Sequence, residues 1–202
     1  MMKYVKKTGA VILAVVLCFL LAACGGAKGR KADESAEQAV KNYLEAVKKQ
    51  DQKTVAQYLE GGDSFSASTE AYEEMPELYD KILDFDYKIL SCEEQDGHAV
   101  VRVEVTTYDF GTFFSGMFQE MFAKAFETMF SETSEEEMDA MMKEYADNNM
   151  SLLKSKNITS EAEIELVKYE DGWKIKDATS MANAILGGVV DSLSDMFGGL
   201  VD

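Results

Sequence analysis

The sequence predicts an α+β fold, with an antiparallel sheet of about four strands packed on amphipathic helices. Two hairpins supply the strands, because Asp96-Gly97 and Asp171-Gly172 each separate two runs in which apolar and polar residues alternate. Helical patterns precede, separate and follow these hairpins. An extra helical segment rich in Phe and Met, from Gly111 to about Leu153, lies between the two hairpins.

The chain begins with a positively charged stretch followed by a short apolar run. Lys3, Lys6 and Lys7 precede the run from residue 10 to residue 23, and no acidic residue occurs before Cys24. A helix needs about 20 apolar residues to cross a bilayer, so this run is short for a membrane span and typical of a signal-peptide core. We therefore predict that residues 1–23 are a cleavable export signal.

The end of that run carries a recognisable motif. Leu21-Ala22-Ala23-Cys24 resembles the lipobox of bacterial lipoproteins, in which the cysteine bears a diacylglycerol thioether. The resemblance implies that Cys24 is lipidated and that the protein is extracytoplasmic, held at the cell membrane by its lipid. Two acyl chains anchor a protein stably, whereas one does so only marginally. The alternative is a plain secretion signal that happens to have a cysteine nearby.

Residues 24–32 are rich in glycine and basic residues and contain nothing to bury. They predict a flexible tether. Its cations can lie near anionic headgroups, although a merely solvated linker explains the composition equally well. The remaining residues, 33–202, are long enough for one domain with a substantial core, and we expect a single domain there.

Charge and cysteine content narrow the function. Loss of residues 1–23 removes three lysines and no acidic residue, which takes the formal net charge from −17 to −20. Such a charge argues strongly against nucleic-acid binding and also against a domain lying flat on an anionic membrane. Once Cys18 is cleaved off and Cys24 is lipidated, Cys92 is alone, so no internal disulfide can form. We expect Cys92 to be a small buried hydrophobe.

The first helices follow from apolar spacing and capping residues. An apolar stripe with helical spacing predicts a helix from about Asp33 to Lys49. Asp51 is then expected to cap a short second helix that reaches Leu59 and ends at Gly61-Gly62. Pro76 is expected in the first turn of a third helix.

The strands are predicted from alternation around the two Asp-Gly turns. The apolar residues of the four predicted strands are, in chain order, Phe85, Tyr87 and Ile89; Ala99, Val101, Val103 and Val105; Ala162, Ile164 and Leu166; and Trp173 and Ile175.

In the segment between the hairpins, Phe and Met pair up every four residues, which places two adjacent apolar ridges on one helix face. Ser134 and Glu137 then form the pattern of a capping box, which starts another helix. A last helical pattern, beginning near Met181, is interrupted by Gly187-Gly188.

The Phe/Met ridges are also the candidate binding surface, because Met-rich faces adapt to varied partners. Simple packing of this face into the sheet explains the pattern more often than not. The remaining possibilities are a hydrophobic ligand pocket, a homodimer interface or a protein-partner surface, and the acidic flanks disfavour membrane contact. The candidate residues are Phe114, Met117, Phe118, Met121, Phe122, Phe126 and Trp173.

Two segments resemble a known superfamily. The first helix followed by residues 48–55, and the closing stretch Tyr169-Glu170-Asp171-Gly172-Trp173-Lys174-Ile175, are similar to the opening and the last hairpin of NTF2-like domains. Small Gram-positive lipoproteins of the DUF4878- and DUF5105-like groups share this layout. The resemblance implies a curved sheet that wraps the helices around a conical cavity, and the Phe/Met segment is longer than that pattern. Members of the superfamily are enzymes, ligand binders or dimerising modules, so fold does not decide function.

Catalytic signals are weak. The single histidine, His98, falls at a hairpin turn and is expected to face solvent. Tyr108-Asp109 could supply an acid/base pair, but an Asp at a strand end more often caps the next helix. Asp84-Phe85-Asp86 lacks the ligand spacing of a calcium loop, and we predict no cofactor or metal site.

The sequence therefore favours a non-catalytic ligand-binding or protein-interaction module that is attached to the membrane through lipid on Cys24. The alternative is a small-molecule enzyme, isomerase-like or dehydratase-like, that uses an NTF2-like cavity.

Overall fold

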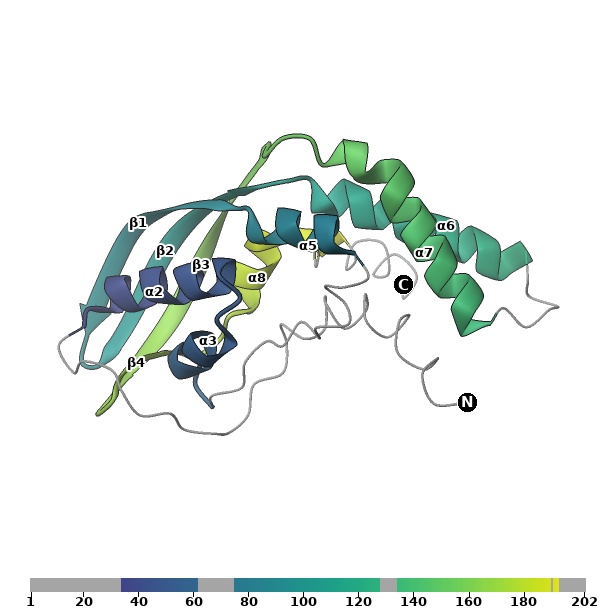
Figure 1. Ribbon diagram of the computed structural model, residues 1–202. Helices are drawn as coiled ribbons and strands as arrows, with labels where there is room; N and C mark the ends of the chain where they lie inside the picture. Colours follow the sequence, from purple (N-terminus) through teal and green to yellow (C-terminus); the bar gives the residue numbers. More distant parts are fainter. Residues whose placement is uncertain (1–33, 62–74, 128–133, 190, 193–202) are drawn as a thin grey trace, which may run out of the picture.

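The computed structural model describes residues 34–61, 75–127, 134–189 and 191–192 (Figure 1). Within these ranges the chain is α+β, with six α-helices and a four-stranded open antiparallel sheet. The fold class and the number of strands are as the sequence predicts. Cys24, the tether and the residues from 193 onward lie outside the described residues.

The four strands pair in chain order, each antiparallel to its neighbour. They are β1 (Asp86–Gln95), β2 (His98–Thr107), β3 (Ile158–Tyr169) and β4 (Gly172–Ile175). Both predicted hairpins are confirmed. In the first, Asp96 and Gly97 have φ values of 51° and 79°, the left-handed pair that a two-residue hairpin turn requires.

Burial alternates along the central strands, so one face of the sheet is buried and the other faces solvent. On β2 the buried residues are Ala99, Val101, Val103, Val105 and Thr107. On the opposite face Arg102 pairs with Glu163 of β3 at 2.7 Å, and both side chains are more than half exposed. Helices therefore have to cover only the buried face.

The first helix, α2 (Ala36–Lys48), crosses that face and contacts β1, β2 and β4. Ser35 caps it by accepting a hydrogen bond from the Gln38 amide, so the helix begins slightly later than the stripe predicted. Tyr43 lies on the inner side of α2 and is only 4% exposed. This burial removes its hydroxyl from solvent and raises the pKa of that hydroxyl to about 12.

The second helix, α3 (Gln52–Tyr58), starts as predicted, with Asp51 accepting from the Thr54 amide at 3.1 Å. It ends earlier than predicted. Leu59 is extended and forms a parallel bridge with Ile175, and the Glu60 amide donates to the Ile175 carbonyl at 2.8 Å. Pairing with β4 competes with the helix here, and no local sequence signal announces it.

Strand β1 is longer than its alternation predicted. The regular pattern stops at Ile89, and the register with β2 shifts between Ile89 and Ser91. The residue at this bulge, Leu90, is 38% exposed, and pairing then continues to the hairpin turn. Because the bulge breaks the alternation of apolar and polar residues, the second half of the strand is not recognisable from the sequence. The preceding helix, α5 (Pro76–Leu83), has its proline in the first turn, as predicted.

The last described helix, α8 (Thr179–Ile185), packs on β2 and β3. Gly187 and Gly188 end it with φ values of 60° and 81°, which confirms the predicted interruption. Gly187 also lies against the end of β2, because a Cβ built on it would be 2.6 Å from the Tyr108 carbonyl oxygen.

These two glycines allow a matched stability test. Gly188→Ala should cost about 1 kcal/mol of unfolding free energy, since Ala resists a left-handed backbone and nothing lies within 4 Å of the new Cβ. Gly187→Ala should cost at least about 1 kcal/mol more, because its Cβ also clashes with a backbone carbonyl. Urea unfolding followed by the fluorescence of Trp173 measures both, and equal losses would contradict the close packing at Gly187.

Candidate functional site: a helical arm and the polar cluster at its root

The Phe/Met-rich segment forms a projecting pair of helices, which we call the helical arm. It comprises α6 (Phe110–Glu127), α7 (Glu135–Asn149) and the short 3-10 helix η2 (Met150–Leu152). Figure 1 shows α6 and α7 side by side, extending beyond the end of the sheet. Asp109 caps α6, accepting from the Thr112 amide at 2.9 Å and from its hydroxyl at 2.8 Å. Asp109 is thus a helix cap, which is the more common of the two roles that the sequence allowed, a cap or a member of an acid/base pair.

The part of α6 nearest the sheet is a packed core element. Phe113 is fully buried and meets Phe114 and Tyr145 edge-on, with ring centroids 5.4 and 5.5 Å apart. Gly116 lets the two helices approach closely, because a Cβ there would lie 2.2 Å from the Tyr145 hydroxyl. Here the Phe/Met ridges fill the interior between the helices.

The outer part of α6 is different. Met121 is half-buried, Phe122 is 46% exposed and Phe126 is 72% exposed. The same repeat of Phe and Met therefore continues past the point where the interior ends. We call these three residues the exposed arm face.

The candidate binding residues divide between these two environments. Phe114, Met117 and Phe118 are buried in the arm. Trp173 is 2% exposed on β4, with the Lys168 ammonium 5.4 Å from its ring centroid. Of the candidates, Met121, Phe122 and Phe126 supply accessible apolar surface.

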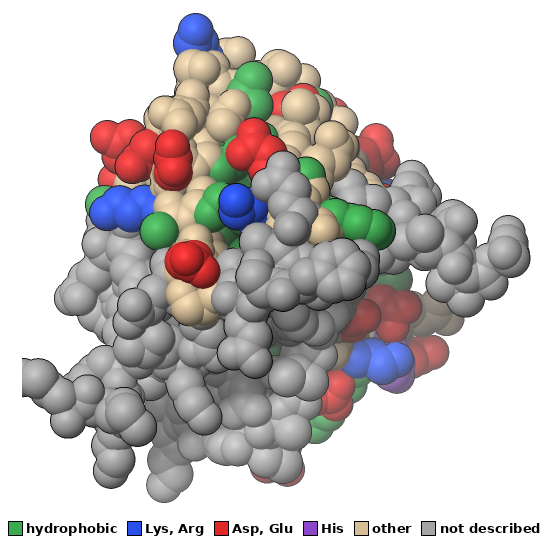
Figure 2. All heavy atoms as spheres, turned by 90° about the vertical axis from the view of Figure 1, so that its right-hand side faces the viewer, with side chains coloured by type: hydrophobic (Ala, Val, Ile, Leu, Met, Phe, Trp, Pro, Cys, Tyr) green, Lys and Arg blue, Asp and Glu red, His purple; other side chains and the backbone are tan. Residues whose placement is uncertain are grey.

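The segment that carries the exposed arm face is acidic in composition. Residues 110–149 contain nine acidic and two basic residues. Glu120 is exposed on α6, and its charge adds to burial in raising the pKa of Tyr145. Figure 2 looks onto this end of the molecule, and on its described part acidic, basic and hydrophobic side chains lie side by side. Exposed apolar side chains on a helical arm of acidic composition give this surface its chemical character.

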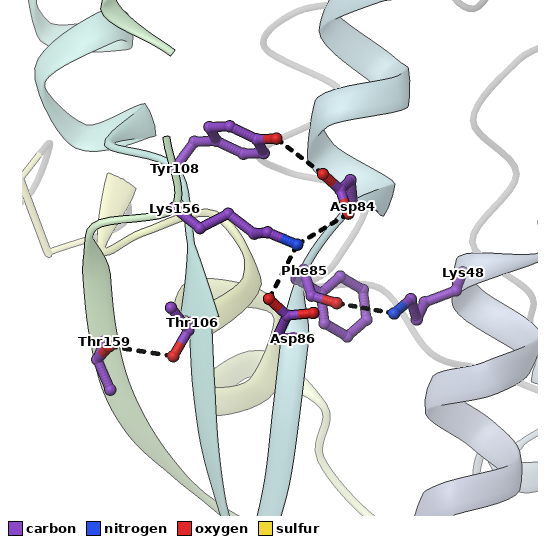
Figure 3. Close-up of polar contacts among 8 residues, drawn as sticks. All are labelled: Lys48, Asp84, Phe85, Asp86, Thr106, Tyr108, Lys156 and Thr159. Atoms are coloured by element: carbon purple, nitrogen blue, oxygen red, sulfur yellow. Dashed lines mark hydrogen bonds and ion pairs between the residues drawn. The ribbon is translucent and has the colours of Figure 1, made fainter. Parts of the chain in front are cut away.

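A polar cluster joins the arm to the rest of the fold (Figure 3). Tyr108, between β2 and α6, donates its hydroxyl to an Asp84 carboxylate oxygen at 2.7 Å. Lys156, between η2 and β3, pairs with Asp84 at 3.0 Å and with Asp86 at 2.9 Å. We call these four residues the root cluster. Both connections between sheet and arm are thus tied to one short stretch, the junction of α5 and β1.

The electrostatics of the root cluster are mutually supporting. The Tyr108 hydroxyl and then the Lys156 ammonium hold the pKa of Asp84 below its usual range. Asp86 and Asp84 together raise the pKa of Lys156, and the Asp84 carboxylate raises the pKa of Tyr108. The Lys81 ammonium adds a cation–π contact, 4.5 Å from the Tyr108 ring centroid. The contacts stabilise the charged forms of Asp84 and Lys156 and the neutral, hydrogen-bond-donating form of Tyr108, so the cluster is suited to fixing geometry.

Sequence reasoning missed this cluster. In the sequence Asp84 and Asp86 only fail to match a calcium loop, and Lys156 belongs to no motif. Lys156 lies 72 positions from Asp84, and only the fold brings the two together.

Other candidate groups lie apart from the arm. His98 is exposed at the start of β2, as expected for a turn residue. Cys92 is half-buried instead of fully buried, and desolvation, followed by the charge of Glu94, raises the pKa of its thiol. Within the described ranges, no group of three or more His, Cys, Asp or Glu residues could hold a metal ion. None of the helices in those ranges combines the length and hydrophobicity that crossing a membrane requires.

The helix-covered face of the sheet is lined mainly by apolar side chains. Val101, Ile164 and Ile175 are at most 1% exposed there. Among the buried side chains that the structure describes, Thr107 is the one outside the hydrophobic set. Within the described part of the chain its hydroxyl has no hydrogen-bond partner. This lining is that of a packing surface.

Comparison with known proteins adds little to this description. No protein-family profile matches the sequence, and no curated protein matches it. The fold is similar to a crystal structure named "putative lipoprotein (ycdA)" from Bacillus subtilis, with 14% sequence identity and a TM-score of 0.36. The match covers 75% of this chain and 47% of that chain, so this chain spans about half the length of the solved protein.

The root cluster predicts a specific acid sensitivity. Because the pKa of Asp84 is lower in the folded protein than in the unfolded chain, its contribution is present at neutral pH and is lost as the pH falls below about 4. The Asp84 side chain is 53% exposed, so solvent screening limits the effect to roughly 0.5–1 kcal/mol.

Chemical unfolding between pH 7 and pH 3 tests this. Asp84→Asn should lower the unfolding free energy at pH 7 and flatten the acid-side loss. The exposed Glu93→Gln is the control and should follow the parent protein. An acid limb that is unchanged in Asp84→Asn would show that Asp84 contributes nothing to it.

Proposed function

We propose that this protein is a lipid-anchored extracytoplasmic binding module, non-catalytic, that recognises a protein partner through the exposed arm face. The sequence around Cys24 supports the anchor. The observation that carries the binding role is the exposure of Phe126, whose side chain is 72% exposed at the end of a ridge that begins with the buried Phe114 and Phe118. Aromatic side chains of this kind are typical anchors of protein interfaces.

The chemistry of the surface selects the occupant. A partner must offer apolar side chains to cover Phe122 and Phe126 and positive charge to complement the excess of acidic residues in the arm. We propose a protein segment in which apolar residues are flanked by Lys and Arg, most simply an amphipathic helix laid along α6. A second copy would bring two acidic arms together, so charge disfavours a homodimer through this face.

We also propose that the scaffold is an NTF2-like domain extended by the arm. The order of α2, α3 and the two antiparallel hairpins supports this. The apolar lining of the helix-covered sheet face supports binding or packing in preference to an isomerase-like or dehydratase-like site.

Peptide binding tests the proposed partner. An amphipathic Leu/Lys helical peptide should bind the protein, more weakly at higher salt, and the matching Leu/Glu peptide should not bind. Phe126→Ser should weaken the binding about tenfold, equivalent to about 1.4 kcal/mol, as for an interface anchor residue. Val100→Thr, on the exposed sheet face and 38% exposed, is the control and should bind like the parent protein. Fluorescence anisotropy of a labelled peptide gives the affinities.

Three outcomes would contradict this partner. Equal binding of the Lys and Glu peptides would remove the charge argument. Self-association in analytical ultracentrifugation that Phe126→Ser abolishes would assign the surface to a second copy. An apolar small molecule retained in native mass spectrometry, and lost from Phe126→Ser, would assign it to a ligand.

The anchor has its own test. Cys24→Ala should abolish labelling of the protein by a fatty-acid analogue in cells, because it removes the thiol that accepts the diacylglycerol. The same change should move the protein from the membrane fraction to the soluble fraction. Labelling or membrane retention that persists in Cys24→Ala would show that another feature holds the protein at the membrane.

A further inference from the structure

We infer that the anchored protein stands on the hairpin end of its sheet, so that the exposed arm face is the part of the folded domain farthest from the membrane. This inference rests on the proposed lipid anchor at Cys24. It adds where the binding surface is presented, and therefore where its partner must be.

The anchored end of the fold lies beside the β1–β2 turn. The Ala36 amide, the first of α2, donates to the Glu94 carboxylate at 2.8 Å. Glu94 is one residue from the end of β1, where the chain turns into β2. Figure 1 shows the start of α2 at this hairpin end of the sheet. The polypeptide that leads back to Cys24 therefore leaves the domain here.

The arm departs from the opposite end of the same strands. Strand β2 has 10 residues and spans about 33 Å before it reaches the root cluster. Helix α6 has 18 residues and adds about 27 Å beyond it. Figure 1 shows the arm continuing away from the sheet. Attachment point and exposed arm face thus occupy opposite poles of the molecule.

The length of chain between Cys24 and Ser35 limits how the domain can turn. These ten residues span at most about 35 Å, whatever their conformation. That reach is shorter than the roughly 60 Å that β2 and α6 span together, so the exposed arm face can meet the bilayer only if the domain tilts strongly toward it.

Charge opposes that posture. The solvent face of the sheet is acidic, and Glu104 even stands directly opposite Glu161 across β2 and β3. A formal charge of −20 after removal of residues 1–23 repels an anionic leaflet as a whole. The tether holds the hairpin end of the sheet near the bilayer, and electrostatic repulsion between the acidic domain and the anionic leaflet keeps the arm away from the membrane. The arm's partner is then met beyond the domain, away from the bilayer.

Energy transfer from the protein to the membrane tests this orientation. In the lipidated protein, Cys92→Ser removes the free thiol of the described part of the chain. A single donor dye is then attached to a new cysteine, either Gln95→Cys at the hairpin end or Ala123→Cys on the arm. Both positions are exposed. The vesicles contain phosphatidylethanolamine and phosphatidylglycerol, with an acceptor dye on a fraction of the headgroups. Transfer from position 95 should exceed transfer from position 123 several-fold.

A longer tether supplies an internal check. Gly-Ser residues inserted after Gly29 should reduce transfer from both positions and narrow the ratio between them, because a longer chain lets the domain rotate. Equal transfer from the two positions with the native tether, or greater transfer from position 123, would overturn the orientation.

Vesicle flotation separates this inference from the proposal on which it rests. Protein that fails to float with the vesicles contradicts the lipid anchor. Protein that floats but transfers energy equally from both positions contradicts the orientation alone.

Discussion

The fold depends on one constraint: an open four-stranded sheet with a single apolar face must be covered by packing, and Cys92, the cysteine of the described part of the chain, is free. Helices α2 and α8, drawn from the two ends of the described chain, lie on that face and close it with aliphatic and aromatic side chains. The edge strand β4 is extended by Leu59 in a parallel bridge, so even a short connection contributes to the sheet. Everything else is attached to this two-layer body.

The arm is such an attachment, and its position is set by polar groups. The hydrogen bond from Tyr108 and the ion pairs of Lys156 converge on Asp84 and Asp86, at the junction of α5 and β1. These contacts are partly exposed, so each contributes modestly to stability. Their value is directional, because they determine where the arm leaves the sheet and hence where Phe126 is presented.

The sequence predicted the parts of the fold that short-range chemistry decides. Asp96-Gly97, Asp51 and the Ser134–Glu137 box each act within a few residues, and each is found as expected. The bulge at Leu90 and the departure of Leu59 from α3 were not predictable, because pairing partners distant in the chain impose them. For the same reason the Phe/Met repeat gave the helix but not its division into buried and exposed parts. The repeat is uniform, and only the position of α7 and the sheet end decides where burial stops.

That division has an energetic consequence. Near the sheet, α6 is held by packed aromatic rings and by the close contact at Gly116. From Gln119 to Phe126 the described side chains of α6 are half-buried or exposed. Local opening is easiest where buried contacts are fewest, so the arm carries a gradient of local stability along its length. An occupant that covers Phe126 supplies the missing burial at the weak end of this gradient. Recognition and stiffening of the arm would then be a single event, and part of the binding free energy would be spent on ordering the helix that makes the contact.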